Sequence, residues 1–465
     1  MIPINIKNIC ELFQVHCPAA LYNQNIINVT MDSRLCSKQS LFVAINGEQS
    51  DGHDFIDSAV NNGAICIVVD KNNNIKRDDV CVIAVDNTVL AMGGIAKLSL
   101  TLYKGQVVSL TGSCGKTTTK QMIASICALQ FDTQATAGNF NNYIGVPLTV
   151  FSTQDQHEIL VAELGANAKG EIEYLNNIVN PDIAILLNAS AAHLDGFEDL
   201  ESVIKTKGEI ITSSHSKTKI ILNKDDPSFS KWLKLSDSKQ VTSFSLTDKT
   251  ADIHILNALY QTDGSLIEVS VYTQVIKIQL NAPGQHIVQN ALAAIAASYL
   301  LKVSNQNIIN GLALFKNCAG RLQKHVLGNV TIWDDSYNAN PASIKSAVDV
   351  LALQNGKKIM VLGDMAEMDS HIEQYSKQLK QYMSTRVDQL LTVGLNSNLI
   401  SEHLKNAQHF NTQELLVEAL FLICLKHDFK NIDIMVKGSR SAKMENVVKQ
   451  FITLIQEKQD DLLVN

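Results

Sequence analysis

The chain is poor in charged residues and has no excess of positive ones. Charged side chains make up 18% of its 465 residues and hydrophobic ones 46%, whereas soluble domains usually contain roughly 25% charged residues. This composition argues against extensive disorder. A net charge of −7 and a pI near 5.9 also give no general attraction to nucleic acid, so any bound phosphate must be held locally.

The sequence also lacks a predicted membrane-spanning segment and a predicted secretion signal. No run of about 18 apolar residues occurs, and residues 1–12 contain no basic leader followed by an apolar core. The nine cysteines are scattered and form no Cys-x-x-Cys pair, which argues against a disulfide framework. We therefore expect a cytoplasmic protein with reduced thiols, no membrane span and no nucleic-acid partner.

No internal repeat or low-complexity segment is present, and the length exceeds what one hydrophobic core usually supports. About three domains are therefore expected. Residues 1–85 contain short apolar runs at 41–45, 65–69 and 80–85 and a helical segment at 55–62. This pattern is typical of a small α/β domain.

Residues 86–314 open with a helical stretch at 88–103, and buried-looking strands then alternate with helical segments, as in a parallel sheet. These strands are expected at residues 107–110, 158–164, 183–187 and 219–222. The segment 256–280 is more typical of antiparallel strands, and residues 289–301 are expected to be helical.

Residues 315–465 again alternate strands with helices, one of them expected at 413–425. The strand candidates are residues 330–333, 358–362 and 432–436. This pattern predicts a Rossmann-like third domain. The predicted fold class is α/β with three domains: a small N-terminal α/β domain, a central P-loop ATPase domain with a mostly parallel sheet, and a C-terminal Rossmann-like domain.

A glycine-rich turn, Thr-Gly-Ser-Cys-Gly-Lys-Thr at residues 111–117, lies between the strand expected at 107–110 and a helix expected at 118–129. Its glycines let backbone N–H groups approach phosphate oxygens at the positive end of the helix. Lys116 is suited to the β- and γ-phosphates and Thr117 to Mg²⁺. Because position 110 is leucine, this is a shorter variant of the common P-loop. The residues predicted to bind nucleotide here are Gly112, Ser113, Cys114, Gly115, Lys116, Thr117 and Thr118.

Other candidates follow predicted strands, where parallel sheets bind ligands. Glu163 ends an apolar run and is a candidate Mg²⁺ ligand, although a solvated carboxylate fits equally well. His193 and Lys207 alone are typical of a structural histidine and a solvated surface lysine. In the third domain, three polar residues each follow a predicted strand and are expected at one sheet edge that faces the glycine loop. The alternative is that they are ordinary polar loop residues. These are Asp335, Asp364 and Lys437.

Several motifs together resemble those of the Mur ligases and occur in that family's order. They are residues 111–117, Glu163-Leu164-Gly165, Asn188 with Ala192-His193-Leu194, Lys207-Gly208-Glu209, and Asn223 with Asp225-Asp226. The resemblance extends from Asp32 to Arg440. Residues 138–142, 335–341, 361–368 and 436–440 are similar to the branch that joins D-alanyl-D-alanine to UDP-N-acetylmuramoyl-tripeptide. The Asp-Asn-Pro-Arg signature of the diaminopimelate-adding branch is absent.

The resemblance implies that residues 1–85 bind the UDP-sugar peptide and 86–314 bind ATP, while 315–465 close over ATP and bind the incoming dipeptide. Two Mg²⁺ ions would be held by Thr117, Glu163, His193 and Lys207, with Lys207 carbamylated; Lys116, Glu163, His193 and Lys207 would be catalytic. Positions near ATP are Asn290, Arg321, Asp335 and Asn338. Substrate positions are Asp32, Ser33, Arg34, Asn46, Gly47, Asn139, Asn141, Asn142 and Lys437. Cys114 departs from the family, which more often has Asn or Ser there.

The expected reaction is ATP-dependent amide formation through an acyl phosphate, by a monomer. The third peptide residue, diaminopimelate or lysine, stays open. The alternatives are another Mur ligase, a folylpolyglutamate synthase-like ligase, or an ATP-driven switch. For a switch the sequence lacks an evident coiled coil, basic stripe or repeat.

Overall fold

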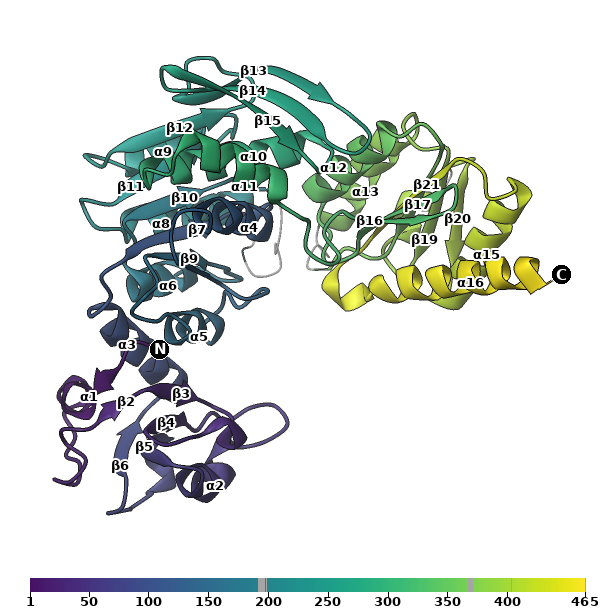
Figure 1. The fold of residues 1–465 in the computed structure, drawn as a ribbon. Helices are drawn as coiled ribbons and strands as arrows, with labels where there is room; N and C mark the ends of the chain where they lie inside the picture. The colour runs from purple at the N-terminus through teal and green to yellow at the C-terminus, as the bar shows by residue number, and fades with distance from the viewer. Residues whose placement is uncertain (191–196, 198, 367–370, 403, 465) are drawn as a thin grey trace.

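The computed structural model describes residues 1–190, 197, 199–366, 371–402 and 404–464, with the backbone alone described for 458–464. Its strands form three large sheets and a two-stranded ribbon, arranged along the chain from the N-terminus to the C-terminus (Figure 1). Within the described residues no helix has both the length and the apolar character needed to cross a membrane.

The N-terminal part is built on a parallel sheet with strand order β3-β4-β5-β6. Its strands are β3 (Asn28–Thr30), β4 (Ser40–Val43), β5 (Ala64–Asp70) and β6 (Cys81–Val85). Strands β1 (Ile4–Asn5) and β2 (Asn25–Ile26) pair as an antiparallel ribbon, and helix α1 (Ile6–Phe13) lies between them in the sequence. Helix α2 (Ile56–Asn61) precedes β5. Helix α3 (Thr88–Leu100) leads into the central sheet.

The central sheet has the order β15-β14-β13-β12-β11-β10-β7-β9-β8. Its strands are β7 (Gln106–Thr111), β8 (Thr133–Ala135), β9 (Ile159–Glu163), β10 (Ile183–Leu186), β11 (Lys219–Asn223), β12 (Val241–Ser245), β13 (Ile253–Tyr260), β14 (Ser265–Val271) and β15 (Gln274–Leu280). Pairing is parallel from β8 to β13 and antiparallel from β13 to β15. The predictions of a parallel sheet and of an antiparallel segment at 256–280 are therefore confirmed.

Helices cover this sheet, and α4 packs beside both α10 and α11. The helices of this region are α4 (Lys116–Cys127), α5 (Gly145–Phe151), α6 (Glu171–Val179), α8 (Leu200–Thr212), α9 (Phe229–Leu235), α10 (Gln285–Leu300) and α11 (Asn305–Leu314). Helix α4 begins two residues before the predicted start, because Gly115 at its N-cap has a φ of +84° and turns the chain directly into the helix.

The C-terminal sheet has the order β16-β17-β21-β18-β19-β20, with only β16 antiparallel to its neighbour. Its strands are β16 (Gln323–Leu327), β17 (Val330–Asp335), β18 (Lys357–Leu362), β19 (Gln389–Val393), β20 (Ala407–Phe410) and β21 (Ile432–Lys437). Its helices are α12 (Pro341–Ala352), α13 (Ile372–Met383), α14 (Asn398–Ser401), α15 (Gln413–Lys426) and α16 (Glu445–Val464). The three strands predicted here and the helix at 413–425 are confirmed.

The central and C-terminal sheets approach each other where α12 lies near the turn of the β13–β14 hairpin (Figure 1). Lys324 forms an ion pair with Asp263 in that hairpin turn, and the Gln354 amide donates to the Thr262 carbonyl at 3.1 Å. These contacts hold the two sheets so that the loops after β7, β9 and β17 open into one space.

Close packing of α11 on α4 makes Gly311 a sensitive position. A Cβ added there would lie 2.4 Å from the Ile126 Cα, whereas one at Gly94 in α3 would meet no atom closer than 3.7 Å. We predict that Gly311→Ala lowers the free energy of unfolding by about 1–3 kcal/mol, the cost of overpacking. Gly94→Ala should be neutral or stabilise by about 0.5–1 kcal/mol. Urea unfolding of both variants tests this, and equal effects would contradict it.

Candidate active site

A cavity of about 1200 Å³ lies between the central and C-terminal sheets. It is large enough for a nucleotide and part of a second substrate, since ligand pockets usually measure roughly 300–1000 Å³. The structure brings most of the predicted site residues to its wall: Ser113, Cys114, Gly115, Lys116, Thr117, Thr118, Asn139, Asn141, Asn142, Glu163, Asn290, Arg321, Asp335, Asn338 and Lys437.

Other predicted residues lie elsewhere. Gly112 lies at the start of the loop and Lys207 in α8, and neither is part of the cavity wall. His193 lies outside the described residues. The candidates for the UDP-sugar site, Asp32, Ser33, Arg34, Asn46 and Gly47, belong to the N-terminal domain and do not line this cavity.

The glycine loop needs glycine at position 115 for two reasons. Its φ of +84° is in the left-handed region, and an added Cβ would lie 2.3 Å from the Asn290 Oδ1. The Lys116 ammonium folds back and donates to the Gly112 carbonyl at 2.6 Å. Although this side chain reaches the cavity, the surrounding protein desolvates it and lowers its pKa. The loop therefore presents backbone N–H groups and one poorly solvated cation, a combination suited to polyphosphate.

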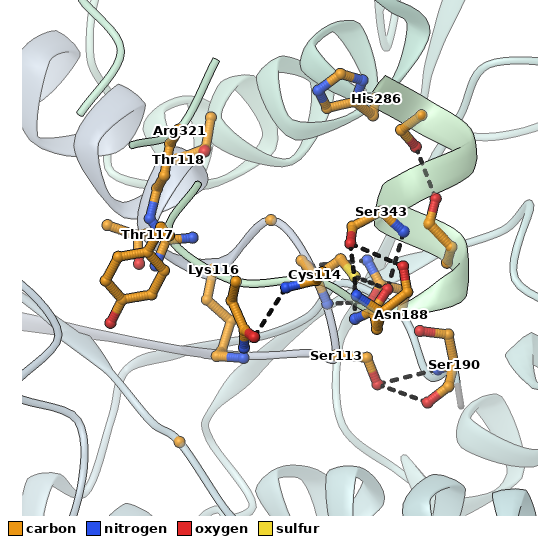
Figure 2. Close-up of a pocket in the computed structure, with 18 of the residues that line it drawn as sticks. Ser113, Cys114, Lys116, Thr117, Thr118, Asn188, Ser190, His286, Arg321 and Ser343 are labelled. Atoms are coloured by element: carbon orange, nitrogen blue, oxygen red, sulfur yellow. Dashed lines mark hydrogen bonds between the residues drawn. The ribbon is translucent and has the colours of Figure 1, made fainter. Parts of the chain in front are cut away.

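Asn188, which follows β10, holds the glycine loop through two hydrogen bonds to Cys114 (Figure 2). Its Oδ1 accepts from the Cys114 N–H at 2.9 Å and its Nδ2 donates to the Cys114 carbonyl at 3.1 Å. The Ser113 hydroxyl donates to the Ser190 carbonyl at 3.1 Å. On the C-terminal side, the amide of Asn340, which caps α12, lies 3.2 Å from the Cys114 sulfur. Cys114 thus joins the loop to the C-terminal domain.

Glu163 ends β9 inside the protein, with a side chain only 1% exposed, so it is not a solvated carboxylate. Its Oε1 accepts from the Thr117 hydroxyl at 3.2 Å and from the Asn141 amide at 2.8 Å. Its Oε2 lies 3.5 Å from the Lys120 ammonium but has no hydrogen-bond partner among the residues that the structure describes. A buried anionic oxygen without a donor, next to a hydroxyl, is the environment that a hard cation would complete.

Lys207 is only 2% exposed, so the alternative of a solvated surface lysine is wrong. Burial, together with the positive charge of Lys116, lowers its pKa to about 7. Its ammonium lies 5.8 Å from the centre of the Phe197 ring, and it has no hydrogen-bond or ion-pair partner among the residues that the structure describes. Near neutral pH a substantial fraction of this amine is therefore uncharged.

The C-terminal side of the cavity is organised around an ion pair between two strand ends. The Lys437 ammonium lies 2.5 Å from the Asp335 Oδ2 and donates to the Asn338 carbonyl at 2.9 Å. The Arg321 guanidinium lies 4.0 Å from the centre of the Tyr337 ring. These contacts fix the loop that carries Asn338 and leave the aromatic and guanidinium groups at the cavity wall.

Asp364 does not share this site, and the expectation that it faces the glycine loop is wrong. Its carboxylate accepts backbone N–H groups of Leu395, Asn396 and Ser397 at 2.8–2.9 Å. It is not part of the cavity wall. A carboxylate that caps three amides of the loop after β19 has few lone pairs left for a ligand, so its role is to hold that loop.

Sequence reasoning missed Lys120, which is fully buried beside Glu163 and donates to the Gly138 carbonyl at 2.7 Å. Its position four residues after Lys116 places both lysines on one helix face, a signal that was available. Tyr337 and His286 also line the cavity. No residue pattern distinguishes these two from structural aromatic residues.

Three models of one protein family match this chain. They are the Mur ligase middle domain over residues 110–298, the Mur ligase glutamate ligase domain over residues 320–440, and the Mur ligase family catalytic domain over residues 25–99. The chain belongs to the Mur ligase family.

Particular members of the family resemble it over nearly its whole length. The UDP-N-acetylmuramoyl-tripeptide–D-alanyl-D-alanine ligase of Escherichia coli (strain K12) is 37% identical over 423 residues, covering 90% of this chain and 92% of the relative. The crystal structure of MurF from Acinetobacter baumannii superposes with a TM-score of 0.89 at 29% identity, covering 97% and 99%. The MurF ligase of Thermotoga maritima in complex with ADP gives 0.83 at 26% identity, covering 93% and 98%.

Burial of Lys207 predicts a specific dependence of stability on pH in buffer free of CO₂ and metal. The unfolded lysine holds its proton up to about pH 10.5 and the folded one only to about 7, so the free energy of unfolding rises with pH across this window. Lys207→Met should remove up to about 1.4 kcal/mol per pH unit of that slope. Urea unfolding at several pH values measures it. The exposed Lys205→Met on the same helix is the control, and an unchanged slope in Lys207→Met would contradict the burial argument.

Proposed function

We propose that this chain is an ATP-dependent ligase that joins D-alanyl-D-alanine to UDP-N-acetylmuramoyl-tripeptide. The observation that carries the proposal is the similarity to the E. coli ligase of that name across 90% of the chain. The cavity is consistent with such chemistry, because the glycine loop and the buried Glu163 carboxylate lie together where two domains meet.

ATP is proposed to occupy the cavity with its phosphates on the glycine loop, since the T. maritima relative is an ADP complex. The Lys116 ammonium would exchange its contact with the Gly112 carbonyl for the β- and γ-phosphates. Asn290, which contacts Gly115, and Arg321, stacked on Tyr337, are proposed to hold the rest of the nucleotide, together with Asp335 and Asn338.

Mg²⁺ is proposed to bind at Thr117 and Glu163, whose Oε2 lacks a hydrogen-bond donor within the described part of the chain. His193 and a carbamate on Lys207 are proposed to complete the set for two ions. Carbamylation joins the neutral amine nitrogen to the carbon of CO₂ with loss of a proton, and the lowered pKa of Lys207 supplies that neutral amine. When bound, Mg²⁺ offsets the negative charge of the phosphates.

In the proposed reaction the terminal carboxylate of the tripeptide attacks the γ-phosphorus, and ADP leaves. The amine of D-alanyl-D-alanine then attacks the acyl carbon and displaces phosphate, which forms the amide. Lys116 would stabilise charge on the transferred group. The cavity wall would keep water from the acyl phosphate, because both domains surround it.

The N-terminal domain is proposed to hold the UDP-sugar through Asp32, Ser33, Arg34, Asn46 and Gly47, and the C-terminal domain to bind the dipeptide and close over ATP. Asp32 and Arg34 already form an ion pair at 2.7 Å, which presents an ordered polar turn. Asn139, Asn141, Asn142 and Lys437 line the central cavity, where the peptide end of the substrate would meet ATP.

Phosphate release tests the function directly. We expect rapid release from ATP only when UDP-N-acetylmuramoyl-tripeptide and D-alanyl-D-alanine are both present, with formation of the pentapeptide. Comparing tripeptides that carry diaminopimelate or lysine identifies the third residue. Lys116→Ala should reduce release by orders of magnitude. Release that follows L-glutamate with a folate acceptor, or that needs only a protein partner, would favour the alternative ligase or switch instead.

The role of Lys207 is tested by chemical rescue. We predict that Lys207→Ala loses nearly all activity, because no carbamate can form, and regains part of it with a short carboxylic acid that fills the space. The exposed Lys205→Ala should keep wild-type activity and show no response to the acid. Full activity of Lys207→Ala without added acid would rule out the carbamate.

A further inference from the structure

Three cysteine thiols meet in the N-terminal domain, outside the cavity and unrelated to the proposed reaction. Cys10 lies in α1, Cys17 in the loop after it, and Cys81 at the start of β6. Their sulfur atoms all lie within 4.8 Å of one another, and those of Cys10 and Cys81 are 3.7 Å apart. Residues distant in the sequence therefore converge on one point.

The spacing of the sulfur atoms fits a metal ion better than a disulfide. With metal–sulfur bonds of about 2.3 Å, two thiolates of a tetrahedral ion are about 3.8 Å apart. The Cys10–Cys81 separation of 3.7 Å matches that edge, whereas a disulfide requires about 2.05 Å. The other two sulfur–sulfur distances are at most 4.8 Å. The Cys17 sulfur would therefore have to move by no more than about 1 Å to reach the same spacing.

The exposure of the thiols leaves a cation access to them. Cys10 and Cys81 are buried, while Cys17 is partly exposed and leaves a route from solvent. Three thiolates cannot share this space without an opposing positive charge. A bound cation supplies that charge, and the thiol protons pass to solvent.

We propose that Cys10, Cys17 and Cys81 bind a thiophilic d¹⁰ cation, Zn²⁺ or Cu(I). Thiolate ligands select these ions over Mg²⁺, which prefers oxygen. The ion ties helix α1 and the loop after it to β6, the edge strand of the N-terminal sheet. It stabilises the domain proposed to hold the UDP-sugar, but its existence does not depend on that function.

The test uses the full-length protein, reduced with a phosphine and stripped of metal by chelation. We expect one Zn²⁺ per chain in competition with a chromophoric chelator, or one Cu(I) per chain in an anaerobic competition, and a higher melting temperature with the preferred ion. Co²⁺ should give sulfur-to-metal charge-transfer absorption. Cys17→Ala, at the partly exposed position, should weaken binding by at least about tenfold, since even changes around a metal's ligands cost that much.

Cys36→Ala is the matched control, because Cys36 is buried in the same domain outside the cluster, and it should bind metal as the wild type does. Cys81→Ala and Cys10→Ala should repeat the loss, and circular dichroism reports whether each is folded. Failure of the wild type to bind either ion, equal binding by Cys17→Ala, or a Co²⁺ complex without sulfur absorption would overturn the proposal. A Cys10–Cys81 disulfide as the native form, seen by mass spectrometry without reductant, would overturn it too.

Discussion

Poorly solvated positive charge around one buried carboxylate is the constraint on which the site depends. Burial lowers the pKa of Lys116 and of Lys120, and the charge of Glu163 acts on both amines. The Glu163 side chain is 1% exposed and lies beside Thr117 and Lys120. Burying two amines near one acid is costly unless a ligand brings negative charge. A polyphosphate is such a ligand, and the carbamate that we propose at Lys207 would add a further negative charge. The same arrangement that lowers stability without ligands therefore prepares the site for them.

The site is formed by two domains, because strand ends from both the central and the C-terminal sheet meet at the cavity. The glycine loop follows β7 and Glu163 ends β9, while Asp335 ends β17 and Lys437 ends β21 in the C-terminal sheet. Carboxyl ends of parallel strands bind ligands because the loops there are free to carry polar groups. Contacts such as Cys114 with Asn340 cross between the domains at the cavity itself. Movement of the C-terminal domain would therefore change the wall of the nucleotide site directly.

Much of this could be predicted from sequence, because strand and helix patterns with a glycine loop are local signals. The strands at 107–110 and 432–436 and the loop residues Gly115 and Lys116 were found in that way. Short strands such as β12 and β19 were not predicted individually, because a few apolar residues next to polar turns give little periodicity. Lys120 and Asp364 show that the contacts of single side chains are harder to predict from sequence than strands and helices. One was overlooked and the other placed in the wrong site, because side-chain partners arise only when distant segments meet.

The central claim is that ATP activates the carboxylate of the tripeptide through an acyl phosphate. Labelling the terminal carboxylate oxygens with a heavy isotope and analysing the released phosphate by mass spectrometry tests it most directly. When both substrates and ATP are present, the account predicts that one labelled oxygen appears in each phosphate released. Pentapeptide formation accompanied by unlabelled phosphate would contradict it, because ATP would then be hydrolysed without passing through the acyl phosphate.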